Sequence, residues 1–157
     1  MQRLNDQYAQ SWKNKITQSG RFLHLITEKD SYSRSSYTHE IQNPIVRKVY
    51  TRLRIDLNIL ATSKVNSGKN MSAICPLCKS EPETVKHFLL KCCHYEQIRN
   101  KFLEDIKQIS PGIQNETAEH KLKYILDLRC PDEAITLCCK FVSNIYGIRE
   151  KFHSNSD

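Results

Sequence analysis

The chain has 157 residues, of which 39% are hydrophobic and 26% charged, and its formal net charge is +7. This length predicts one domain, or a domain with an attached helical arm, and the four glycines and five prolines argue against a β-sandwich or a collagen-like chain. The first residues lack the apolar core of a secretory signal, and no apolar run approaches the ~20 residues that span a bilayer. We therefore expect no membrane partner.

Cysteine usage gives information on the cellular compartment. The chain has seven cysteines, an odd number, and no export signal accompanies them. Reduced thiols fit this pattern better than a disulfide framework. We expect an intracellular protein of the nucleus or cytoplasm.

The positive charge is concentrated in the N-terminal half. Residues 1–70 hold 12 Lys/Arg and five Asp/Glu, whereas residues 71–157 hold 12 of each kind. Such a basic segment favours a polyanionic partner, most plausibly nucleic acid, either RNA or DNA. A solvated basic face on an ordinary domain explains the charge alone equally well.

The first third of the chain divides into an N-terminal helical arm, residues 1–29, and a linker, residues 30–43. Apolar residues at every fourth position predict a helix over 4–18 within the arm. The linker is polar, rich in serine and without a period. The apolar positions of the arm helix are Leu4, Tyr8, Trp12 and Ile16.

Asn43 and Pro44 form a favourable helix start, with Asn as the cap and Pro in the first turn. Apolar residues at steps of three and four predict that this helix runs to about Ala61. A flank of the apolar stripe carries guanidinium, hydroxyl and amide groups, the composition of a phosphate-contacting surface, although plain solubility is the alternative. With a lysine from the far side, the candidate nucleic-acid-binding residues are Arg47, Lys48, Thr51, Arg54 and Asn58.

The centre of the chain contains the pattern C-x2-C-x8-H-x4-C, formed by Cys75, Cys78, His87 and Cys92. A Cys3His set at these spacings is typical of a tetrahedral structural zinc site, so we expect one Zn²⁺. All four positions are filled by protein ligands, which indicates a structural site, because a catalytic site keeps one position open for water.

The last ligand spacing places a constraint on the backbone. A helix is expected to start near Thr84, and on an unbroken α-helix His87 and Cys92 would lie about 140° apart. We therefore expect the helix to end or tighten near Lys91. Cys93 and His94 are rival candidates for the fourth ligand.

The same region resembles the zinc-binding region that follows the polymerase in non-LTR (LINE-like) retrotransposon reverse transcriptases. The resemblance covers about Val46 to Phe102, and Cys93-His94 stands where that family usually has proline. It implies a role beside a reverse transcriptase domain, helping to hold template RNA or target DNA. The residues that carry it are Leu53-Arg-Ile-Asp-Leu57, Cys75-Pro-Leu-Cys78, Glu83-Thr-Val-Lys-His87-Phe-Leu-Leu-Lys-Cys92 and Tyr95.

A polar loop is predicted over 62–72, and three amphipathic helices are predicted over about 95–109, 117–128 and 131–152. Arg99 and Lys101 are expected to point outward from the first of these helices. The apolar stripe of the last helix requires a partner surface. We expect an all-α fold of five or six helices with a Cys3His zinc-stapled turn, divided into a zinc-binding core, 44–110, and a C-terminal helical pair, 111–157.

The chain shows no catalytic motif that we can identify: it lacks a Gly-rich phosphate loop, G-x-S-x-G, H-E-x-x-H and an Asp-Asp pair. We therefore expect a non-catalytic structural zinc module of reverse-transcriptase or retrotransposon origin, which binds nucleic acid through its basic N-terminal half. Two alternatives remain open. In the first alternative, the chain is a protein–protein interaction module whose helix 131–152 docks on a polymerase domain. In the second, it is an inert retrotransposon-derived fragment.

Overall fold

The computed structural model describes residues 37–55, 58–69, 71–126 and 130–154, together with four isolated helical positions between residues 7 and 14. Apart from those four positions, the arm 1–29 with the helix predicted over 4–18 lies outside the described residues, and so do residues 30–36 of the linker. At the end of the linker the structure has a single helical turn, α3 (Tyr37–Glu40).

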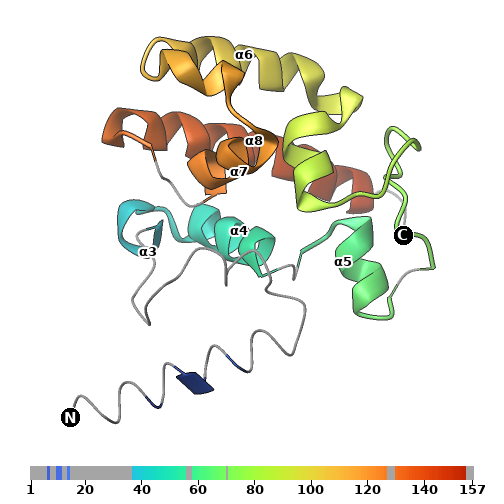
Figure 1. Ribbon diagram of the computed structural model, residues 1–157. Coiled ribbons are helices and arrows are strands. Elements are labelled where there is room, and N and C mark those ends of the chain that lie inside the picture. The colour runs from blue at the N-terminus through green and yellow to red at the C-terminus, as the bar shows by residue number, and fades with distance from the viewer. Residues whose placement is uncertain are drawn as a thin grey trace.

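The expected all-α class is confirmed for the described part of the chain, which contains six α-helices and no strand (Figure 1). None of the described helices combines the length and the apolar character that crossing a bilayer requires. Short π- and 3₁₀-helices occupy His87–Lys91, Cys93–Tyr95 and Pro111–Asn115. After α3 the α-helices are α4 (Pro44–Arg54), α5 (Ala61–Asn66), α6 (Glu96–Lys107), α7 (Ala118–Leu126) and α8 (Asp132–Ser154).

The long C-terminal helix α8 is the centre of the hydrophobic core, with α4 on one side and α6 on the other (Figure 1). The part of its apolar stripe from Ala134 to Ile145 is buried, whereas Ile148 and Phe152 at the far end of the stripe are partly exposed. Phe141 of α8 stacks on Phe102 of α6, with ring centroids 4.4 Å apart. The stripe therefore finds its partner surface within the chain. One cluster of buried residues runs through both the predicted 44–110 core and the predicted 111–157 pair.

The helix predicted from Pro44 to Ala61 starts as expected but ends early. The Asn43 side chain accepts hydrogen bonds from two backbone N–H groups of the first turn, which confirms the cap. The prediction of its end was wrong, because α4 stops at Arg54. A separate helix, α5, begins at Ala61 and extends to Asn66, into the predicted loop.

Side chain–backbone hydrogen bonds account for this break. The Asn58 side chain accepts from the Leu60 N–H at 2.9 Å, and the Asn58 N–H donates to the Ser63 hydroxyl at 3.0 Å. Such local bonds offer the backbone an alternative to the helical ladder. Leu60 is consequently extended and reaches the core at the start of α5.

A buried ion pair joins the middle of the chain to α8. Arg149 of α8 donates to both carboxylate oxygens of Glu83, at 2.6 and 3.0 Å, and both side chains are at least 95% buried. Burial disfavours the guanidinium charge, but the hydrogen bonds and charge of Glu83 outweigh burial and raise the pKa of Arg149. The Glu83 carboxylate also accepts from the Ala61 N–H at 2.7 Å, so it fixes the start of α5 as well.

Replacing Arg149 by leucine is expected to lower the free energy of unfolding by about 3–5 kcal/mol, because the Glu83 carboxylate stays buried without its counter-ion. Urea denaturation followed by circular dichroism measures this loss. The control is Lys86→Gln, which breaks the exposed Lys86–Glu119 pair and should leave the denaturation midpoint unchanged. Equal midpoints for the two variants would show that the buried pair does not stabilise the fold.

Candidate metal centre

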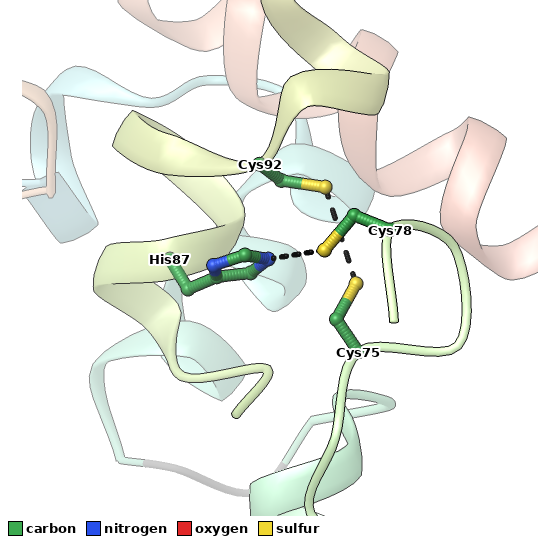
Figure 2. Close-up of side chains that lie close together, drawn as sticks. All are labelled: Cys75, Cys78, His87 and Cys92. Atoms are coloured by element: carbon green, nitrogen blue, oxygen red, sulfur yellow. Dashed lines mark hydrogen bonds between the residues drawn. The ribbon is translucent and has the colours of Figure 1, made fainter. Parts of the chain in front are cut away.

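Cys75 and Cys78 belong to a tight turn that brings both thiols toward one point (Figure 2). The Cys75 N–H donates to the Glu81 carbonyl at 2.9 Å, and the Lys79 N–H donates to the Cys75 carbonyl at 2.8 Å. An antiparallel bridge between Ile74 and Pro82 closes the loop. Lys79 completes the turn in the left-handed region, with φ of 56°.

His87 and Cys92 are brought together by a π-helix. The Cys92 N–H donates to the His87 carbonyl at 2.8 Å, a bond that spans five residues instead of the four of an α-helix. Because of this wider turn, two residues that are five positions apart, such as His87 and Cys92, lie on the same face of the helix. The helix ends at Lys91 as predicted, but it widens before it ends and does not tighten.

The structure brings together the four residues predicted from the spacing. One ligand atom from each of Cys75, Cys78, His87 and Cys92 lies within 4.8 Å of all the others (Figure 2). The Cys75 and Cys92 Sγ atoms are 3.9 Å apart, and the Cys78 Sγ lies 3.3 Å from the His87 Nε2. Three of the residues are buried, and Cys78 is half-buried. Such a cluster has the geometry to hold one metal ion.

The rival ligands do not join the cluster. Cys93 and His94 are both exposed, and they lie in a 3₁₀ turn that leads away from the π-helix. Cys92 is completely buried beside Cys75. The fourth position is therefore filled by Cys92.

The three thiols have different acidities. Burial raises the pKa of Cys75, and it raises the pKa of Cys92 to about 12. At Cys78 burial also acts to raise the pKa, but hydrogen bonds, chiefly from the Ser80 side chain and backbone, outweigh it and lower the pKa to about 6. Cys78 is thus the cysteine of the cluster that is ionised most easily at neutral pH.

Polar groups around the cluster orient its members. The His87 Nδ1, on the far side of the ring from the cluster, lies 3.4 Å from the Glu81 carboxylate, the arrangement in which a carboxylate fixes the tautomer of a metal-binding histidine. The Arg99 side chain donates to the Cys92 carbonyl at 3.1 Å. Glu83 also contacts the cluster, with its Oε1 3.9 Å from the Cys75 Sγ.

The sequence analysis missed Glu81, Glu83 and Arg149, and it placed Arg99 incorrectly. Arg99 does not point outward as expected, because only 9% of it is exposed. One signal was present for Arg149, which follows Ile145 by four residues and so continues the apolar stripe of α8. A charged residue on such a stripe indicates a buried partner.

The predicted nucleic-acid-binding residues do not form one exposed surface. Arg54 is 4% exposed and donates to the Leu126 carbonyl, while Arg47 donates to the Ile41 and Gln42 carbonyls. The Thr51 hydroxyl donates to the Arg47 carbonyl, and Asn58 shapes the turn before α5. Lys48 alone among the five is exposed. Their contact with nucleic acid stays a prediction, and Lys48 is the residue best placed to make it.

No protein-family model matches the chain, and neither the curated proteins nor the solved structures contain a match. The resemblance to the retrotransposon zinc-binding region therefore stays a prediction. The site is assigned from the geometry of its four side chains and from their chemistry.

The pair Cys92→Ser and Cys93→Ser tests which cysteine is the fourth ligand. Cys92→Ser should remove the metal from the purified protein, because a neutral hydroxyl is a poor replacement for a thiolate. Cys93→Ser should retain about one metal ion per chain, the content that we expect of the wild type. Mass spectrometry of native protein and elemental analysis measure this stoichiometry. The reverse result would identify Cys93 as the ligand.

Lys79→Gly tests the turn between the two ligand pairs. Glycine adopts a positive φ without the strain that Lys79 bears, but ordering glycine on folding costs more conformational entropy. The net effect should be a rise of about 0.5–1 kcal/mol in the free energy of unfolding. Lys79→Ala removes the same side chain but retains the strained φ, and it should give no gain. Urea denaturation of the metal-saturated proteins compares the two variants.

Proposed function

We propose that the Cys3His cluster binds one Zn²⁺ and that the site is structural. With Zn–S bonds of about 2.3 Å and Zn–N bonds of about 2.0 Å, tetrahedral ligands lie roughly 3.5–3.8 Å apart. The distances of 3.9 Å between two sulfurs and 3.3 Å between sulfur and nitrogen lie just outside this range, so small shifts of the side chains would bring these ligands to zinc-binding separations. The mutual approach of the four ligand atoms is the observation on which the proposal rests.

A closed ligand set supports a non-catalytic role for the proposed zinc. Three thiolates and one imidazole fill the four positions of a tetrahedron, which leaves none for a water or a substrate. The ion would link the turn around Cys75 to the π-helix around His87. Because Glu83 contacts Cys75 and pairs with Arg149, the same ion would also stabilise the docking of α8.

We further propose that the module binds nucleic acid. The support is the distribution of charge: the whole excess of +7 lies in residues 1–70, and residues 71–157 are balanced. Within the described part of that basic half, Lys48 and Lys69 are exposed. Phosphate contacts by lysines of this kind need no sequence-specific geometry. The resemblance to the zinc-binding region of retrotransposon reverse transcriptases points in the same direction.

Docking of α8 on a polymerase domain, the alternative function, has less support. Its apolar stripe was the expected docking surface, and the part of that stripe from Ala134 to Ile145 is buried against other helices of the chain. Ile148 and Phe152, at 36% and 38% exposure, are the exposed large apolar residues of α8 within its described part. No contact in the described part of the chain favours this alternative over nucleic-acid binding.

Zinc binding should release about two protons near pH 7.5, because Cys75 and Cys92 have raised pKa values and must lose protons, whereas Cys78 is already ionised. Zinc affinity should therefore fall as the pH falls. Isothermal titration calorimetry in buffers of different ionisation enthalpy counts the protons. A count near zero would contradict thiolate ligation by these residues.

Binding of a single-stranded RNA and of a duplex DNA should weaken steeply between about 50 and 200 mM salt, as counter-ion release requires. The double variant Lys48→Gln/Lys69→Gln should reduce the slope of log K against log salt by about one to two. Fluorescence anisotropy measures both affinities and slopes.

The matched control is Lys101→Gln/Lys107→Gln, which removes the same charge from exposed positions of α6, in the balanced half of the chain. Its slope should stay closer to that of the wild type. Equal slopes for the two double variants would show that overall charge, and not the basic half, drives binding. Absence of binding at the lower salt would refute the proposed function and leave the zinc site unaffected.

A further inference from the structure

An apolar cavity lies between the π-helix, α6, α7 and α8. Its volume is about 190 Å³. Aromatic and aliphatic side chains form most of the wall, and three cations interrupt it: Lys91, Arg99 and Lys121. None of the lining residues carries a carboxylate. The main apolar lining residues are Leu90, Phe102, Leu103, Ile113, Ile125 and Phe141.

Arg99 is the unusual member of this lining. Its side chain is buried, and its hydrogen bond to the Cys92 carbonyl uses one of its five N–H donors. Within the described part of the chain, no carboxylate lies within salt-bridge distance of its guanidinium. Burial lowers the pKa of Arg99, and the charge of Glu96, three residues earlier on α6, offsets only part of this effect. A buried guanidinium keeps its charge, and a charge in an apolar wall is costly unless an anion compensates it.

The other two cations add to this positive charge. Lys121 donates to the Gln114 carbonyl at 2.8 Å, a neutral partner that leaves its charge in place. Lys91 lies 3.7 Å from Glu81, and both of those side chains are about half exposed, so this contact compensates little charge. Three positive charges therefore surround an apolar space.

We propose that this cavity binds a small organic carboxylate with an aromatic or short aliphatic body. The body occupies the apolar space, and the carboxylate accepts hydrogen bonds from Arg99 and from a lysine. The size is suitable, because an apolar cavity of roughly 150 Å³ is known to accommodate benzene. A guanidinium fork matches the geometry of a carboxylate better than that of other common anions except phosphate.

A nucleobase fits this cavity less well. Reading a base requires hydrogen-bonding groups along its edge, and the lining contains no amide side chain and no Ser or Thr. The one hydroxyl, that of Tyr124, is engaged with the Ser110 hydroxyl at 2.7 Å. The site is therefore separate from the proposed nucleic-acid surface, and it does not depend on the proposed function.

The test uses the full chain, loaded with metal, and three probes that separate charge from shape. Phenylacetate carries both the ring and the carboxylate, phenylacetamide has nearly the same shape without the charge, and acetate has the charge without the ring. Phenylacetate should bind roughly tenfold more tightly than either control, because a charge-assisted hydrogen bond and apolar burial each contribute about that factor. Titration followed by NMR gives the three affinities.

Two variants locate the site. Ala118→Phe places a ring in the cavity and should abolish phenylacetate binding while the metal content is retained. Arg99→Gln should bring the affinity for phenylacetate down to that for phenylacetamide, whereas Lys101→Gln, at an exposed position of the same helix, should leave it unchanged.

Three outcomes would overturn the proposal: equal affinities for phenylacetate and phenylacetamide, unchanged binding by Ala118→Phe, or full displacement of phenylacetate by a short RNA. If Arg99→Gln does not fold, Lys121→Gln takes its place. That variant should weaken phenylacetate binding several-fold and leave the affinity for phenylacetamide unchanged.

Discussion

The carboxylate of Glu83 joins three parts of the chain that are distant in sequence. It forms a bidentate pair with Arg149 of α8, accepts a hydrogen bond from the start of α5 and lies beside the Cys75 thiol. A buried carboxylate is stable only if its partners are all in place. The Glu83 carboxylate therefore holds the turn around Cys75, the short helix α5 and the central helix α8 in a single arrangement.

This arrangement changes the role expected of a metal ion. Many small zinc domains are unfolded without their ion. The structure instead has a continuous core around α8, in which Tyr50, Leu53 and Ile145 are completely buried. Bound metal would then order the region from the Cys75 turn to the π-helix, and the Glu83–Arg149 pair would transmit that order to a core with its own apolar contacts.

Local patterns in the sequence predicted most of the helices and the four members of the Cys3His cluster. The four ligands lie within 18 residues, and the chemistry of Cys and His at those spacings is specific enough to identify them. The start of α4 was equally predictable, because the cap at Asn43 depends on adjacent residues only. These features share one property: every residue involved is close in sequence to its partners.

Features that depend on distant partners were not predictable in the same way. Glu83 and Arg149 are 66 residues apart, and nothing near either residue specifies the other. The end of α4 was missed for a different reason, because apolar residues continue at helical spacing past Arg54 although α4 ends there. Arg99 was expected in solvent because most arginines are exposed, and only the packing of α6 on α7 shows that it lines a cavity.

The π-helix between His87 and Cys92 has a consequence for how such centres are recognised. A π-turn is an α-turn with one additional residue, so loss of a single residue from 88–91 would restore an α-helix and still leave histidine and cysteine on one face. A π-turn with H-x4-C spacing and an α-turn with H-x3-C spacing would thus place the two ligands in the same relative position. A search that fixes the number of residues between these ligands would separate proteins whose metal sites are geometrically alike.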